Sequence, residues 1–377
     1  MMSQELEGLI ALSNHYGTRT EYVIAGGGNT SYKTKTTLWV KGSGQALGTI
    51  GEQGFVKMDR AALAALWTQS FSADTALREK QVLECLMAAR LPGEEAKRPS
   101  VETLLHDMLP FTYVVHTHPT LVNALTCGQN GKAAFDRLFG AVAVWIPLVD
   151  PGYVLSKVVK DALEAYQKAH GKAPSVIFLQ NHGLVVAGNS PAEIRDTYRT
   201  LLADLERELK FKADLTPAGV DALAEIAFLQ ALAPLARQEL GTEVAFVARS
   251  TAKSVLALAE SEAAFGPLSS AFTPDHIVYM GVSPVRVDAV GELPRAFADY
   301  KQKYGKAPRA VLAKGLGGFC LGPNAKAAGQ AQQLLLDAVQ IAVASPSFGG
   351  PLFMTKPAID FIVSWEVEAF RSSVSSK

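Results

Sequence analysis

The second half of this 377-residue chain repeats the first, and the repeat limits the fold more than any other feature of the sequence. YQKAHGKAPSVIFLQNHGLVVAGNS (166–190) aligns without a gap with YKQKYGKAPRAVLAKGLGGFCLGPN (300–324). In the same register, VAVWI (142–146) falls on HIVYM (276–280). Self-similarity of this kind indicates a duplicated structural unit.

A third match lies earlier in each half, where YVVHTH (113–118) falls on EVAFVA (243–248). Strand-like and helix-like segments alternate along the chain, which indicates the mixed α/β class. Because three matches occur in the same order, we predict a first domain over residues 1–215. We predict a second, degenerate and related α/β domain over residues 216–377.

Composition narrows the class of protein. Hydrophobic residues make up 48% of the chain and charged residues 19%, which is typical of a globular protein. Lys+Arg and Asp+Glu both number 36, a balance that excludes a polybasic nucleic-acid binder. The chain has three cysteines without a CxxC pair, no signal-peptide pattern and no membrane-length apolar run. We therefore expect a cytoplasmic protein with neither nucleic acid nor membrane as a partner.

Three histidines form the main candidate site. His116 and His118 stand two apart on a predicted strand, so their rings point to one face. His182 lies at the tip of another predicted strand, next to a glycine. Three imidazoles with an open fourth position are typical of a catalytic zinc site. The alternative is that the HxH pair is a coincidence at a strand end and His182 is a turn residue.

The repeat favours the metal site over that alternative. In the aligned second half, all three candidate ligands are absent while the surrounding framework is kept. Loss of all three together is expected when a site is lost as a unit. The aligned residues are Phe246, Ala248 and Leu316.

Glu102 in PSVETLLH is a candidate catalytic carboxylate. One interpretation places it in the first turn of a helix, where the helix dipole favours a negative charge. The other lets it reach the metal site as a base, with a pKa raised toward neutrality by a partly dry pocket. His106 lies four residues on, on the same helical face, and we expect it to pack there or to orient Glu102.

Two short glycine loops, GGGNTS (26–31) and KGSG (41–44), are candidates for phosphate binding. Such loops can present backbone N–H groups to an anion, and Asn29, Ser43 and Ser100 would add side-chain donors. Neither loop has the GxGxxG or GK[ST] pattern of a nucleotide site.

Taken in order, GGGNTS, KGSG, PSVE, HTHP and QNHGL resemble the motifs of the class II aldolase/adducin family. The longer strings GGGNTSYK and WVKGSGQALGTI look most like the aldolase part of bifunctional rhamnulose-phosphate aldolase/short-chain dehydrogenase proteins. The resemblance implies a three-layer α/β/α first domain. The internal repeat indicates that the second domain is a duplicate without the metal ligands.

The resemblance assigns roles to individual residues. It implies that His116, His118 and His182 bind Zn²⁺, with another divalent metal as the alternative, and that Glu102 moves protons at the substrate carbon. Tyr153 is a candidate proton donor on a looser alignment. Val101 replaces a serine found in many members, which removes one hydroxyl from the phosphate site. The implied phosphate-binding residues are Gly28, Asn29, Ser43, Gly44 and Ser100.

The resemblance therefore predicts a zinc-dependent lyase that reversibly cleaves a ketose 1-phosphate, of the rhamnulose or fuculose type, to dihydroxyacetone phosphate and an aldehyde. A sugar-phosphate 4-epimerase or dehydratase uses the same metal ligands and stays an alternative. A non-enzymatic adducin-like interaction module is a second alternative. A homo-oligomer is expected, and a separate dehydrogenase is a candidate partner.

Overall fold

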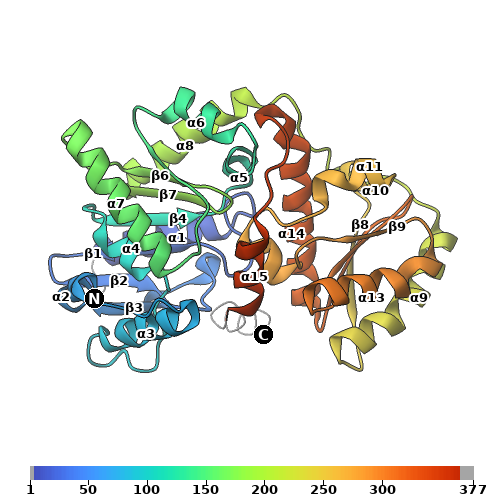
Figure 1. The fold of residues 1–377 in the computed structure, drawn as a ribbon, viewed down its shortest axis with the longest axis horizontal. Helices are drawn as coiled ribbons and strands as arrows, with labels where there is room; N and C mark the ends of the chain where they lie inside the picture. Colours follow the sequence, from blue (N-terminus) through green and yellow to red (C-terminus); the bar gives the residue numbers. More distant parts are fainter. Residues whose placement is uncertain (1–3, 366–377) are drawn as a thin grey trace. The chain divides into compact units, whose positions relative to one another are not determined.

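The computed structural model describes residues 4–365, which form two compact units (Figure 1). Among these residues, the first unit consists of 4–122, 132–207 and 365, and the second of 123–131 and 208–364. Both units contain a β-sheet and helices, so the predicted mixed α/β class is confirmed. Residues 366–377 of the predicted second domain lie outside the described residues.

The first unit is built on a seven-stranded sheet with the order β3-β2-β1-β4-β7-β6-β5. Its neighbouring strands are antiparallel except β5 and β6, which are parallel. The strands are β1 (Asn29–Lys33), β2 (Thr37–Lys41), β3 (Phe55–Asp59), β4 (Tyr113–Thr117), β5 (Val144–Ile146), β6 (Val176–Leu179) and β7 (Gly183–Gly188).

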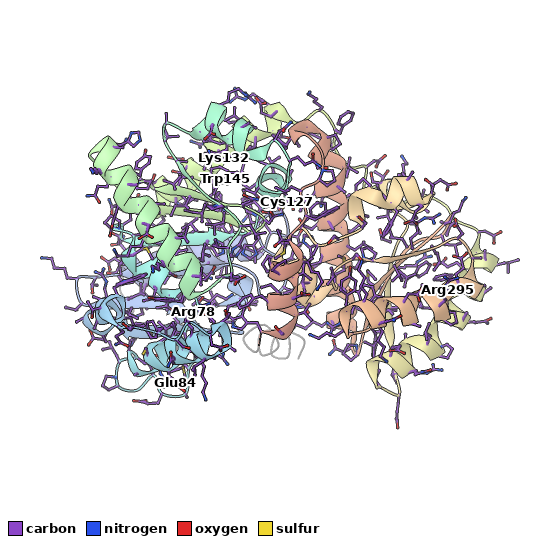
Figure 2. All side chains as sticks on the ribbon, viewed as in Figure 1. Arg78, Glu84, Cys127, Lys132, Trp145 and Arg295 are labelled. Carbon is purple, nitrogen blue, oxygen red and sulfur yellow. The ribbon has the colours of Figure 1, made fainter. Side chains whose placement is uncertain are left out.

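Helices cover both faces of this sheet, and side chains fill the space between the layers (Figure 2). The helices of this part of the chain are α1 (Gln4–Gly17), α2 (Arg60–Ala65), α3 (Thr75–Ala88), α4 (Thr103–Met108), α5 (Thr120–Thr126), α6 (Gly131–Phe139), α7 (Tyr153–His170) and α8 (Pro191–Glu208). Short 3₁₀ turns are η1 (Leu47–Thr49), η2 (Glu52–Gly54) and η3 (Leu66–Thr68).

Alternation along β4 assigns its residues to the two faces of the sheet. Val114 packs in one apolar cluster with Leu105 of α4 and Val159 of α7. Thr117 points the other way, where its hydroxyl lies 2.6 Å from the hydroxyl of Tyr198 on α8. The predicted three-layer α/β/α architecture is therefore confirmed, and the α4 side of the sheet is the side on which His116 lies.

The second unit has a four-stranded sheet with the order β8-β11-β10-β9. β11 is antiparallel to β8 and to β10, and β10 is parallel to β9. The same order and the same directions occur in β4-β7-β6-β5 of the first unit. The sequence repeat is thus matched by a repeat in topology. The strands are β8 (Phe246–Ser250), β9 (Val285–Val287), β10 (Ala310–Ala313) and β11 (Gly317–Gly322).

The helices of the second unit pack around this sheet. They are α9 (Ala222–Leu240), α10 (Lys253–Ala259), α11 (Glu262–Phe265), α12 (Pro274–Tyr279), α13 (Leu293–Tyr304), α14 (Ala325–Ala344) and α15 (Lys356–Ser364), with the 3₁₀ turns η4 (Gly266–Leu268), η5 (Val290–Glu292) and η6 (Ser345–Phe348). Within residues 4–365, no helix combines the length and the apolar content that a membrane crossing requires.

The match of VAVWI to HIVYM is wrong in structural terms. Residues 276–279 belong to α12, whereas the strand that pairs as β5 does is β9. Thr273 is extended at the N-cap and Pro274 follows at the first helical position, an arrangement that starts a helix. The apolar pattern of a short segment did not distinguish a buried helix from a buried strand.

Strand register also corrects the second-half counterparts of the first two histidines. His116 on β4 is opposite Val185 on β7, and Arg249 on β8 is opposite Phe319 on β11. Val185 and Phe319 coincide in the ungapped repeat. Arg249 is therefore the counterpart of His116.

By the same register, Thr251 is the counterpart of His118, so the assignments to Phe246 and Ala248 are wrong. Leu316 keeps its place opposite His182 in the ungapped repeat. Arginine, threonine and leucine offer a cation no imidazole, so this part of the second unit still lacks the triad.

Candidate metal centre

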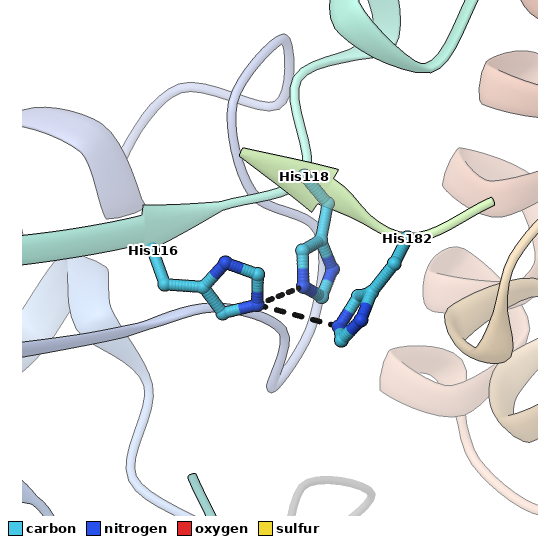
Figure 3. A group of neighbouring side chains, drawn as sticks. All are labelled: His116, His118 and His182. Atoms are coloured by element: carbon cyan, nitrogen blue, oxygen red, sulfur yellow. Dashed lines mark hydrogen bonds between the residues drawn. The ribbon is translucent and has the colours of Figure 1, made fainter. Parts of the chain in front are cut away.

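The three histidines converge where the central strands β4 and β7 meet, at one end of these strands (Figure 3). His116 lies within β4, His118 lies one residue beyond its end, and His182 lies in the turn between β6 and β7. The antiparallel pairing of β4 with β7 brings this turn to the end of β4. The centroids of the three rings are 4.8–5.0 Å apart.

The ring nitrogens face one another. The Nε2 atom of His116 lies 3.0 Å from Nε2 of His118 and 3.3 Å from Nε2 of His182. The Nδ1 atom of His116 lies 3.0 Å from the carbonyl oxygen of Leu184. Since a carbonyl only accepts, Nδ1 carries the proton and the Nε2 lone pair of His116 points at the other rings.

The local backbone allows this close approach. A Cβ atom at Gly183 would lie 2.4 Å from the carbonyl oxygen of Thr117, so only glycine lets β7 come this near to β4. Asn181, just before His182, has a φ of 53°, in the left-handed region that asparagine tolerates better than most residues. Gly28 has a φ of 64°, and a Cβ there would lie 2.7 Å from the carbonyl oxygen of His116.

Glu102 joins this cluster from the start of α4. It occupies the N-cap position, but its side chain makes no capping hydrogen bond. Its Oε2 atom lies 3.5 Å from Nε2 of His116, and Oε1 lies 3.7 Å from Nε2 of His182. Oε1 is buried and has no hydrogen-bond partner among the described residues. The carboxylate therefore faces the imidazoles and leaves the helix N–H groups to other acceptors.

The surroundings keep Glu102 ionised. Burial pushes the pKa of its carboxyl upward, but the positive charge of His116 and His182 in their protonated form and the hydrogen bond from the Asn29 amide outweigh burial and lower the pKa to about 2. The expectation that a dry pocket raises this pKa toward neutrality is therefore wrong. Desolvation alone would raise this pKa, but the fold also places His116, His182 and Asn29 around the carboxylate.

A buried polar network holds the other oxygen of Glu102. The Nδ2 atom of Asn29 donates to Oε2 at 2.6 Å and to the hydroxyl of Ser100 at 3.3 Å. The ring of His106 contacts Asn29 Oδ1 through Nε2 and the hydroxyl of Ser31 through Nδ1, the latter at 2.7 Å. The sequence left open whether His106 packs on the helix or orients Glu102. In the structure, both ring nitrogens of His106 have a polar partner in this network.

The second glycine loop lies beside Ser100. The Ser43 N–H donates to the Arg98 carbonyl at 2.7 Å, and the Ser100 N–H donates to the Lys41 carbonyl at 3.2 Å. Gly44 has a φ of 82°, which favours glycine. The structure thus brings the loop that contains Ser43 and Gly44 next to the segment that leads into Glu102.

Lys41 is a residue of this region that sequence reasoning missed. Its side chain is buried, and its ammonium donates to the carbonyl oxygens of Gly26 and Gly28, at 3.0 and 2.7 Å. The first glycine loop is therefore tied to the second by a charged side chain. The available signal was that KGSG itself begins with a lysine and that a cluster of three glycines precedes it in the sequence.

Residues 7–203 match the family model described as the class II aldolase and adducin N-terminal domain. This match covers more than half of the chain. The chain belongs to the class II aldolase and adducin family. The family resemblance inferred from the five sequence motifs is confirmed by this match.

Individual proteins are similar to parts of this chain. An uncharacterized oxidoreductase, YuxG of Bacillus subtilis (strain 168), is 31% identical over 194 residues, which are 49% of this chain and only 27% of that protein. A solved N-terminal class II aldolase domain of a conserved protein from Thermoplasma acidophilum is 27% identical, with a TM-score of 0.46, and covers 55% of this chain and 94% of its own. An L-fuculose-1-phosphate aldolase from Thermus thermophilus is 15% identical, with a TM-score of 0.35, and covers 54% and 92%.

The cluster of three histidines suits a divalent cation. Each of the three imidazoles offers one ring nitrogen, and these atoms lie within 4.8 Å of one another, so all three can coordinate one cation. The buried Oε1 of ionised Glu102 lacks a hydrogen-bond donor in the described part of the chain. Three histidine nitrogens that leave a fourth position open are a ligand set of catalytic zinc sites.

Tyr153 lies apart from these contacts. It is the first residue of α7, and its ring packs on Trp67 and on Phe71, with centroids 6.3 and 5.0 Å away. These neighbours form part of the apolar cluster beneath α3. Its role as a proton donor stays a prediction from the family resemblance.

Proposed function

We propose that the chain is a zinc-dependent class II aldolase that reversibly cleaves a ketose 1-phosphate to dihydroxyacetone phosphate and an aldehyde. The observation that carries this proposal is the convergence of three histidine Nε2 atoms beside an ionised, buried carboxylate. The family membership supports the same chemistry.

His116, His118 and His182 would hold the zinc ion through their Nε2 atoms. When bound, zinc supplies a Lewis acid that polarises the oxygens of the sugar and balances the charge that forms on bond cleavage. The hydrogen bond from His116 Nδ1 to Leu184 fixes the tautomer and the angle of that ring.

Glu102 would move the proton at the reacting carbon. Asn29 occupies Oε2 with a 2.6 Å hydrogen bond, so Oε1 is the oxygen left to accept the proton and return it. A carboxylate that is held on one side and open on the other needs little reorganisation during the reaction.

The two glycine loops would bind the substrate phosphate. Backbone N–H groups near Gly28 and Gly44, and the hydroxyls of Ser43 and Ser100, form the proposed site. Asn29 links it to Glu102 through its bond to Ser100. Binding energy from a phosphate held away from the reacting carbon would fix the orientation of the sugar.

Zinc content and product identity test this proposal together. Purified wild type should contain about one zinc ion per chain and release dihydroxyacetone phosphate from one of a panel of ketose 1-phosphates. His116→Ala should lose both properties, whereas His170→Ala, an exposed histidine at the end of α7, should keep both. Formation of an intact isomer would favour the epimerase, and a metal-free, inactive wild type would favour the interaction module.

We also propose that the protein is a cytoplasmic homo-oligomer whose aldehyde product is consumed by a separate dehydrogenase. The support is the resemblance to bifunctional aldolase/dehydrogenase proteins. Light scattering of the purified chain tests assembly. A dehydrogenase that co-purifies and oxidises or reduces the released aldehyde would support the partnership, and a monomer without such a partner would reject it.

A further inference from the structure

The Asn29 amide has two orientations of similar shape and opposite chemistry. With Nδ2 toward Glu102, it donates a 2.6 Å hydrogen bond to the carboxylate. After a half-turn about its last bond, Oδ1 would face Oε2, and two acceptors would repel each other. The orientation of one amide therefore decides whether Glu102 is held or displaced.

His106 is the residue that distinguishes these two orientations. It is fully buried on α4, and burial lowers the pKa of its ring to about 3, although Glu102 opposes the shift. The ring is therefore neutral and has a single N–H. Its Nε2 atom faces Oδ1 of Asn29, and its Nδ1 atom faces the hydroxyl of Ser31.

The sheet sets both contacts at once. Asn29 and Ser31 stand two apart on β1, so their side chains share the face of the sheet that α4 covers. A hydroxyl can donate or accept, whereas Oδ1 of Asn29 only accepts. The consistent arrangement puts the ring proton on Nε2 and lets Ser31 donate to Nδ1.

We propose that His106 is a positioning residue: its Nε2–H holds the Asn29 amide in the orientation that donates to Glu102 and thereby aims the carboxylate at the three histidines. The inference deepens the proposed function and relies on it for its kinetic test. The geometry that it explains is independent of the reaction.

The ring proton provides a direct test on the unaltered protein. In the chain labelled with ¹⁵N-histidine, long-range ¹H–¹⁵N spectra distinguish the two neutral tautomers, and His106→Gln assigns the His106 signals by their loss. We expect the proton on Nε2 at neutral pH. A proton on Nδ1 would require Ser31 to accept and Asn29 to donate toward the ring, which would overturn the proposal.

A matched pair of substitutions tests the kinetic consequence. The amide nitrogen of glutamine can lie near the position of histidine Nε2, whereas that of asparagine lies near Nδ1. His106→Gln thus keeps a donor for Asn29 and gives up Ser31, and His106→Asn does the reverse. We expect kcat to fall by roughly 10–100-fold in His106→Asn and by less than roughly tenfold in His106→Gln, at equal zinc content.

A purely structural role predicts a different result. In that case the two variants would lose thermal stability and kcat in parallel, or asparagine would be the better replacement, and either result would reject the proposal. If wild type cleaves no ketose phosphate, the proposed function fails and the tautomer alone decides the role of His106. An active aldolase with the proton on Nδ1 would keep the function and reject the positioning role.

Discussion

Glu102 has two unlike carboxylate oxygens. Oε2 accepts from Asn29, while Oε1 faces His182 without a donor in the described residues. In the proposed mechanism this difference assigns one oxygen to positioning and the other to proton transfer. A side chain with those two tasks cannot be shortened or neutralised without loss.

Replacing Glu102 separates chemistry from metal binding. Glu102→Ala should lower kcat by about 10²–10⁴-fold because the proton has no acceptor, while the three histidines keep zinc. Turnover of a ketose phosphate and zinc content measured on one sample check this. Glu95→Ala, on an exposed loop residue, is the control. Unchanged turnover in Glu102→Ala would remove this residue from the mechanism.

At the scale of elements, the contact between β4 and β7 determines the metal site. A Cβ at Gly183 would lie 2.4 Å from the Thr117 carbonyl oxygen and 2.8 Å from Cδ2 of His118. Gly183→Ala should therefore push the strands apart, displace His118 and weaken zinc binding by roughly tenfold or more. Competition with a chelator measures the affinity. Gly51→Ala, where a Cβ meets nothing within 4 Å, should bind zinc as wild type does.

Strand β1 contains a buried lysine, Lys33, that should make the stability of the protein depend on pH. Lys33 donates to the carbonyl of His106, and burial lowers its pKa from 10.5 to about 7. Between these pH values the unfolded chain holds a proton that the folded chain has lost, so the free energy of unfolding rises with pH. Below about pH 7 Lys33 is protonated in both the folded and the unfolded chain, so the folded protein bears the full free-energy cost of burying the charge.

Lys33→Met should consequently raise the melting temperature by a few degrees at pH 6 and by less at pH 9. Thermal unfolding followed by circular dichroism across this range measures the difference from wild type. Lys35→Met, an exposed neighbour, should show no such trend. A gain that is equal at both pH values would show that Lys33 stays protonated when folded, so that burial does not lower its pKa into this range.

Sequence patterns predicted some helices and strands correctly and missed others. The β6–β7 hairpin around His182 was predictable because two apolar runs flank a polar turn that ends in glycine. Strand β9 was missed because a three-residue edge strand has little periodicity to detect. The network of Asn29, Ser31 and His106 depends on β1 and α4 meeting across many residues, which local patterns do not encode.

At the scale of the whole molecule, the same four-strand topology occurs twice, and the imidazole triad occurs in the first copy. In the second copy, register places Arg249, Thr251 and Leu316 at the three positions. We expect about one zinc per chain and almost none in His182→Ala. A full equivalent of zinc retained by that variant, measured by mass spectrometry, would place a metal site elsewhere.

The sequence separation of 66 between His116 and His182 sets the order of events when the chain folds. The two rings meet only after β4 has paired with β7. The three ligands are therefore complete only late in folding, after the entropy cost of closing the long loop between these strands has been met. Bound zinc should therefore stabilise the folded sheet mainly by slowing its unfolding. Stripping it with a chelator should speed unfolding several-fold while leaving the refolding rate nearly unchanged.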